Sequence, residues 1–146
     1  MTEKMKVPAW FWVVAVLLLF WNIMGILSFL GSVNATEESL IASGMYNAEQ
    51  AALMMSFPSW TKYIYIAATA TGLIGALGLI LRKKFALPFF IISFILAAFH
   101  HIYIYASTDA LNVMGNLDKI MSAVVIGLCL LQIWFSRFSI RKTWLS

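Results

Sequence analysis

The chain has 146 residues, of which 62% are hydrophobic and only 11% charged, and its mean hydropathy is +0.89. A soluble domain is about 45–50% apolar and about 25% charged, and a chain this short could not bury the excess apolar side chains in a soluble core. The composition therefore excludes a soluble globular domain, a disordered chain and a coiled coil. The net charge of +4 does not indicate nucleic-acid binding, because the basic residues lie at the ends of apolar runs.

Four apolar runs are each long enough to cross a bilayer as a helix, which takes about 20 residues. They are continuous, whereas the strands of a membrane barrel are shorter and alternate in polarity. The second and third are joined by the basic turn Arg82-Lys83-Lys84. We predict a single all-α domain over residues 1–146, an antiparallel four-helix bundle in the membrane. Its spans lie at about 9–30, 60–81, 85–106 and 119–138, with an outer loop at 31–59.

Lysine and arginine are distributed unequally between the two ends of this bundle. With four spans, only Lys62 and Lys119 of the ten basic residues lie at the end that carries the outer loop. The others are Lys4, Lys6, Arg82, Lys83, Lys84, Arg137, Arg141 and Lys142. The positive-inside rule then predicts a multi-pass protein of the plasma membrane with both termini in the cytoplasm. Belts of aromatic residues agree with this orientation: Trp10, Trp12, Trp134 and Trp144 at the inner interface, and Trp60, Tyr63, Tyr103 and Tyr105 at the outer one.

An alternative interpretation of the first run is a cleaved signal peptide. Lys4 and Lys6 precede the run, and Val33-Asn34-Ala35 resembles a cleavage site. The apolar core of a signal peptide has about 7–15 residues, whereas this run has 22. We therefore expect a retained span.

The outer loop at 31–59 is expected to be partly helical. Asn34 or Thr36 can cap a short helix that begins with Glu37 and Glu38, where negative charge suits the helix dipole. A second helix is predicted from Asn47 to Met55. The apolar residues of the loop favour a position on the membrane surface or across the end of the bundle.

Small and polar residues recur along each span at steps of three and four, which places them on one helix face. Since helices in lipid associate through such residues, these faces should meet inside the bundle. The four sets are Ala15, Leu18, Asn22, Gly25 and Phe29; Lys62, Tyr65, Thr69, Gly72 and Ala76; Ser93, Ala97, His100, Ile104 and Ser107; and Asp118, Ser122, Val125, Cys129, Gln132 and Ser136. The glycines Gly72, Gly75 and Gly78 are expected to be packing residues, within the chain or across a dimer.

Several of these polar residues fall at similar depths in the outer half of the bilayer. A buried amide or imidazole without a partner costs about 2–7 kcal/mol, so we expect them to hydrogen-bond to one another. The cluster is a candidate ligand site in which Trp21 and Asn22 hold a polar group. The alternative gives Asn22 only a packing role. The candidate ligand-binding residues are Trp21, Asn22, Tyr65, Thr69, His100 and Ser122.

Metal, haem and catalytic sites are not expected. His100 and His101 point about 100° apart on a helix, and the chain has no other histidine to complete a zinc or haem site. Instead we expect one of the two to be hydrogen-bonded inside the bundle and the other to face the outer interface. Cys129 is the sole cysteine and cannot form an internal disulfide. Hydrolase, metalloprotease and nucleotide-binding motifs are absent, which favours a protein that is not an enzyme and has no cofactor.

Three stretches of the sequence resemble a group of small four-span bacterial inner-membrane proteins. They are PAWFWVVAVLLLFWNIMG, the loop end FPSW, and GLIGALGLILRKKFALPFFIISFI. Members of this group are mostly hypothetical proteins, and some carry a loose sugar-transporter label. The resemblance covers the first two thirds of the chain and implies a bacterial inner membrane, without assigning binding residues.

Three interpretations of function follow. The first is a non-enzymatic accessory or interaction component, whose partner besides the lipid bilayer is a membrane protein or a second copy of the chain. The second is a small transporter or ligand-binding protein that uses the outer polar cluster. The third is a subunit of an oxidoreductase that holds quinone or haem near His100.

Overall fold

The structure, a computed structural model, describes residues 5–146. Lys4, which the charge distribution assigns to the cytoplasmic side, lies outside the described residues. The described chain forms seven helices and no strand, and four of these helices are long and apolar enough to cross a membrane. The protein is therefore an all-α, multi-pass membrane protein, as the composition predicts.

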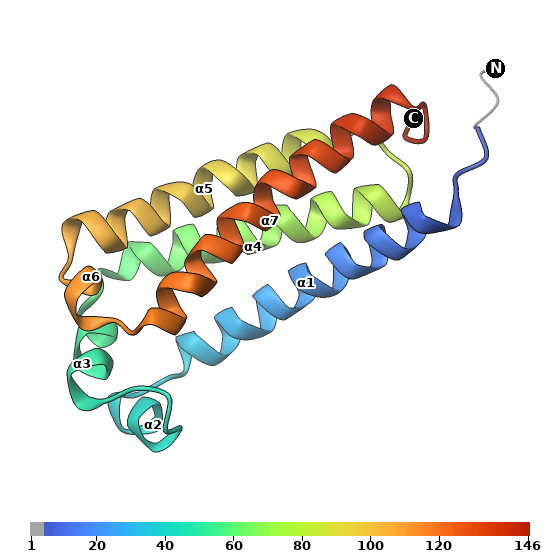
Figure 1. Ribbon diagram of the computed structural model, residues 1–146. Helices are drawn as coiled ribbons and strands as arrows, with labels where there is room; N and C mark the ends of the chain where they lie inside the picture. Colours follow the sequence, from blue (N-terminus) through green and yellow to red (C-terminus); the bar gives the residue numbers. More distant parts are fainter. Residues whose placement is uncertain (1–4) are drawn as a thin grey trace.

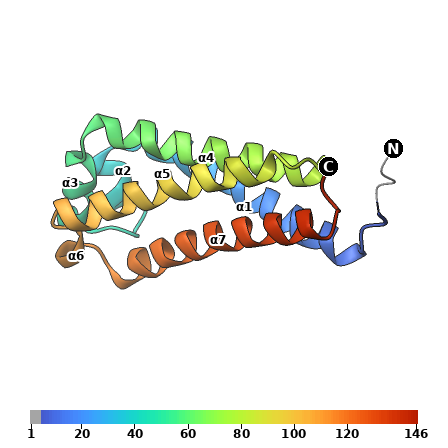
Figure 2. The same ribbon diagram turned by 90° about the horizontal axis from the view of Figure 1, so that it is seen from above.

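The four long helices form an antiparallel bundle in which each helix packs against the next (Figure 1). They are α1 (Ala9–Val33), α4 (Ser59–Ile80), α5 (Ala86–Ser107) and α7 (Asn116–Arg141). Helix α7 extends beyond the predicted span at both ends, because the apolar run is flanked by polar residues that also form helix. Both ends of the described chain lie at one end of the bundle, here called the terminal end (Figures 1 and 2).

Three short helices lie at the opposite end, called the cap end: α2 (Glu37–Ala42), α3 (Ala48–Ser56) and α6 (Ala110–Val113) (Figure 2). Two of them begin with capping boxes. The Thr36 hydroxyl accepts a hydrogen bond from the Ser39 N–H at 3.1 Å, and the Asn47 side chain accepts one from the Gln50 N–H at 2.8 Å. Helices α2 and α3 confirm the two helices expected in the outer loop, whereas α6 was not predicted.

The glycines of α4 pack within the chain. Gly72, Gly75 and Gly78 are all buried where α4 meets α1 and α5. A Cβ atom on Gly75 would lie 2.7 Å from a ring carbon of Phe90, and one on Gly78 would lie 2.8 Å from the Phe85 ring. The absence of side chains thus lets the aromatic rings of α5 lie directly on the α4 backbone. The sequence left open whether these glycines pack within the chain or across a dimer, and the structure shows that they pack within the chain.

The C-terminal segment folds back onto the bundle, which corrects the prediction for Trp144. Instead of marking a membrane interface, the Trp144 side chain is 8% exposed and packs edge-on against Phe11 and Phe138. The reversal follows from the end of α7, where Thr143 adopts φ 58° and the Trp144 N–H bonds to the Ser139 carbonyl at 2.9 Å.

Helix α4 ends in the same way, and the two helix ends are joined. Arg82 has φ 55°, and the Lys83 N–H bonds to the Gly78 carbonyl at 2.8 Å. The Arg82 guanidinium donates from Nε to the Trp144 carbonyl at 2.8 Å, and the Ser146 N–H donates to the Arg82 carbonyl at 2.9 Å. These bonds hold two non-glycine residues in the left-handed region, where glycine is the usual residue.

Candidate functional site

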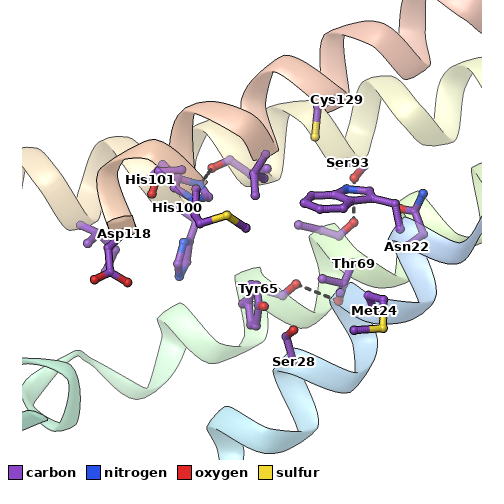
Figure 3. A pocket seen from close by; sticks show the side chains of 18 of the residues that line it. Asn22, Met24, Ser28, Tyr65, Thr69, Ser93, His100, His101, Asp118 and Cys129 are labelled. Atoms are coloured by element: carbon purple, nitrogen blue, oxygen red, sulfur yellow. Dashed lines mark hydrogen bonds between the residues drawn. The ribbon is translucent and has the colours of Figure 1, made fainter. Parts of the chain in front are cut away.

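A cavity of about 480 Å³ lies inside the bundle, between its middle and the cap end (Figure 3). All six candidate ligand-binding residues line it: Trp21, Asn22, Tyr65, Thr69, His100 and Ser122. They come from all four long helices, so the faces picked out by residue spacing do converge. Along α7 the lining extends from Asp118 to Gln132, a length of about 21 Å at 1.5 Å per residue.

The cavity walls are mostly apolar, with polar groups gathered toward the two ends. The end near the middle of the bundle, called the inner end, carries Asn22, Ser93 and Gln132. Toward the cap end lie Asp118, the two histidines, and the residues Met54 and Phe57 that close the cavity from the cap. Figure 3 shows Asp118 and the histidines on one side of the space and Asn22, Ser93 and Cys129 on the other.

Most of the polar side chains that line the cavity hydrogen-bond to the backbone of their own helix. The prediction that these side chains hydrogen-bond to one another is therefore wrong for most of them. Asn22 Nδ2 donates to the Leu18 carbonyl at 2.7 Å, and the Thr69 hydroxyl donates to the carbonyls of Tyr65 and Ile66. A helix always offers carbonyls one turn earlier, which satisfies short polar side chains without a partner helix. Two bonds do cross helices: Ser122 with the Tyr105 hydroxyl at 2.9 Å, and the Ser93 hydroxyl to the Ala68 carbonyl at 2.7 Å.

Two buried amides keep free hydrogen-bonding capacity toward the cavity. The Gln132 side chain is 2% exposed, lines the cavity and bonds to no other group among residues 5–146. Asn22 is 8% exposed, and its Oδ1, which lies against Gly72, accepts no hydrogen bond within the described chain. Buried polar groups in native proteins are almost always paired. The free positions of these two amides are available to a molecule that enters the cavity, a ligand or water.

Both histidines line the cavity, which corrects the expectation that one of them faces the outer interface. The ring of His100 stacks on the ring of Tyr65, with centroids 5.7 Å apart and an interplanar angle of 28°. His101 Nδ1 donates to the Ala97 carbonyl at 2.8 Å, whereas His100 Nδ1 is buried and without a partner in the described structure. The Tyr65–His100 pair forms a flat aromatic wall.

Hydrogen bonds fasten the cap over the cavity. The Tyr46 hydroxyl donates to the Asp118 carboxylate at 3.4 Å, and Gln50 Nε2 donates to the Val113 carbonyl at 3.1 Å. Burial, and secondly the negative charge of Asp118, raise the pKa of Tyr46 above its ordinary value of 10.0. Tyr46 thus remains a neutral donor at physiological pH, and the cap covers the end of the bundle as its apolar residues predict.

The cavity reaches the outer surface of the bundle between α1 and α7. Met24 on α1 and Met121 on α7 both line the cavity, and they are 43% and 45% exposed. Ser28, also exposed, lies on the α1 side of the same edge (Figure 3). Toward the terminal end this edge is closed, because Phe11 of α1 stacks on Phe135 of α7 with ring centroids 5.5 Å apart. The cavity therefore has a lateral opening at the membrane-facing surface.

Comparison of the chain with protein families, with curated proteins and with solved structures gives no match. The resemblance to small bacterial inner-membrane proteins thus stays a prediction. Within the described residues there is no group of three or more histidine, cysteine, aspartate or glutamate side chains that could hold a metal ion. The arrangement can instead hold an organic molecule by apolar contact, aromatic stacking and hydrogen bonds.

The recurring sets of small and polar residues contain more of the cavity lining than the six candidate residues. Asp118, Ser93 and Gln132 belong to the recurring sets and also line the cavity, but they were not among the candidates, which were chosen from residues at similar depth. Met54 and Phe57 were not chosen as site residues, since the sequence predicts that the loop covers the end of the bundle but not which of its side chains reach the cavity. The unpaired amide of Gln132 could not be recognised before the partners available to it were known.

Proposed function

We propose that this membrane protein binds a small, largely apolar molecule in the cavity between α1, α4, α5 and α7. The single observation that carries the proposal is that all six residues chosen for ligand binding from sequence spacing line one cavity of about 480 Å³. Ligand sites are concave, mostly apolar and fitted with a few convergent polar groups. This cavity has those properties, and its size lies within their usual range of about 300–1,000 Å³.

The cavity favours the ligand-binding interpretation over the other two. An accessory protein that acts only through its outer surface needs no hollow between its helices, and close packing would stabilise it better. A haem subunit needs axial ligands, usually from two helices, whereas His100 and His101 both belong to α5. We propose binding or transport, and assign no chemical reaction to the site.

The charge distribution supports an orientation for the site. Lys6, Arg82, Lys83 and Lys84 lie at the terminal end, as do the basic residues in the last turns of α7. On the positive-inside rule we propose that this end faces the cytoplasm and that the cavity lies in the outer half of a bacterial inner membrane. A reporter that is active only outside the cytoplasm checks this orientation when fused after Ser146, where it should be silent.

The lateral opening supports access from the bilayer. A molecule dissolved in the outer leaflet would meet the edge between Met24 and Met121 without passing through water. The cap, held by the Tyr46 and Gln50 hydrogen bonds, separates the same cavity from the aqueous side. The geometry thus suits a membrane-soluble ligand better than a water-soluble sugar.

Filling the cavity should abolish binding. Val125 lines the cavity, whereas its neighbour Val124 is 40% exposed on the lipid-facing side of the same helix. We expect Val125→Trp to retain at least about tenfold less of the bound molecule on purification than wild type, which corresponds to a loss of about 1.4 kcal/mol of binding free energy. We expect Val124→Trp to retain as much as wild type. Native mass spectrometry of the protein extracted from its own membrane measures the retained mass.

The two tryptophan variants separate blocked binding from damage to the fold, because they add the same side chain one residue apart. Equal retention by wild type, Val124→Trp and Val125→Trp would contradict the proposal. So would a wild-type protein that carries no additional mass after mild extraction.

A further inference from the structure

The charge of the cavity lining restricts what it can hold. Asp118 is the one carboxylate among the lining residues, and no lysine or arginine contributes to the lining. An anionic headgroup would leave water without gaining a countercharge and would be repelled by Asp118. The lining therefore disfavours a phosphate, sulfate or carboxylate group.

The inner end supplies hydrogen bonds of a kind that suits a neutral group. The Gln132 amide offers both a donor N–H and an acceptor oxygen, and Asn22 Oδ1 offers a further acceptor. Asp118 lies about 21 Å from Gln132 along α7 at 1.5 Å per residue, at the far end of the cavity. A cationic group paired with Asp118 at the far end of the cavity would leave the two amides unpaired. A hydroxyl at the inner end can donate to an amide oxygen and accept from the Gln132 N–H.

The walls between the two ends suit an apolar body. Trp21, Tyr65 and Val125 line this region, and the opening between Met24 and Met121 leads directly to the lipid. A chain or flat ring can lie along these walls and continue out into the bilayer. The ligand would then bind with its polar end deepest in the protein.

From these observations we infer that the ligand is an uncharged amphiphile whose terminal hydroxyl group hydrogen-bonds to the side chains of Gln132 and Asn22. The inference rests on the proposed function and narrows it to one chemical class. Phospholipids of the surrounding bilayer carry a phosphate, for which the lining supplies no lysine or arginine as countercharge, so we expect the site to discriminate against them.

Three probes with the same alkyl chain test this class: dodecanol, dodecyl phosphate and dodecyltrimethylammonium. Each is added at the same mole fraction to nanodiscs that contain the full-length protein, and retention is measured by native mass spectrometry. We expect wild type to retain dodecanol at least about tenfold more than dodecyl phosphate. Gln132→Leu, which keeps the volume and removes the amide, should lose about tenfold of dodecanol retention, the effect of leaving one polar partner unpaired.

Asp118→Asn separates the role of charge from that of the amides, since it removes the carboxylate and keeps an acceptor for Tyr46. Equal retention of dodecyl phosphate by wild type, or full retention of dodecanol by Gln132→Leu, would overturn the inference. So would preferred binding of dodecyltrimethylammonium that is lost in Asp118→Asn. If wild type retains none of the probes above the level of Val125→Trp, the proposed function itself fails.

Discussion

Replacing Gly75 with alanine is expected to destabilise the bundle by about 1–3 kcal/mol, the usual cost of forcing extra volume into a packed core. The new methyl group would lie 2.7 Å from one ring carbon of Phe90 and 2.8 Å from another. The Phe90 ring cannot move aside easily, because its side chain is 0% exposed and is surrounded by buried residues. The α4 and α5 backbones must therefore separate along their shared seam. Unfolding in mixed micelles titrated with denaturing detergent measures the loss of free energy.

Gly127 supplies the matched control. It lies in the middle of α7, and a Cβ atom there would meet nothing within 4 Å. Since alanine favours a helix over glycine by about 0.5–1 kcal/mol, Gly127→Ala should leave stability unchanged or raise it slightly. Gly75→Ala as stable as wild type would show that α4 and α5 are not packed as described. A loss of stability in both variants would mean that glycine stabilises these helices by something other than the close contact between the α4 backbone and the Phe90 ring.

Replacing Trp144 with alanine is expected to cost about 3–5 kcal/mol, the range found for large aromatic side chains removed from a core. The Trp144 ring packs against Trp10 with centroids 5.3 Å apart and against Phe138 at 5.4 Å. Its removal leaves a space between α1 and α7 at the terminal end and loosens the hydrogen bonds to Arg82. The same detergent titration measures the effect.

Trp134 distinguishes packing from a general need for tryptophan near the interface. It lies on the same helix as Phe138 and stacks on it at 5.4 Å, but its side chain is 57% exposed. We expect Trp134→Ala to cost less than about 1 kcal/mol, in line with substitutions at the surface. Equal costs for the two variants would contradict the buried position of Trp144.

The membrane bundle could be predicted because its determinants are local. Length and hydropathy of each run define a span, and spacing of three and four residues defines the face that is buried. Asn22, Gly72, Ala97 and Gln132, chosen on spacing alone, are all buried where the helices meet. Lys62 is an exception: it keeps the spacing of the α4 face but is exposed, since a lysine near the end of a span reaches the polar interface.

Contacts between distant segments could not be predicted. The buried position of Trp144 depends on Thr143 adopting a left-handed conformation. Glycine usually marks such a conformation in a sequence, and position 143 is a threonine, so the sequence did not indicate the reversal. The prediction for the polar cluster failed for a different reason. It placed the residues together correctly but assumed that hydrocarbon would force them to pair with one another. Instead, backbone carbonyls one turn away accept hydrogen bonds from Asn22 Nδ2 and from the Thr69 hydroxyl. Because these polar side chains bond to their own helices and not to one another, the space between them remains as the cavity.

The central claim, that the cavity holds a membrane-soluble molecule, is tested most directly by a high-resolution map of the protein in nanodiscs made from its own membrane. The account predicts density that does not belong to the chain, extending from Gln132 and Asn22 past the Tyr65–His100 stack to the edge between Met24 and Met121. A map in which α1 and α7 pack against each other along their whole length, with side chains filling the space of the cavity, would contradict it.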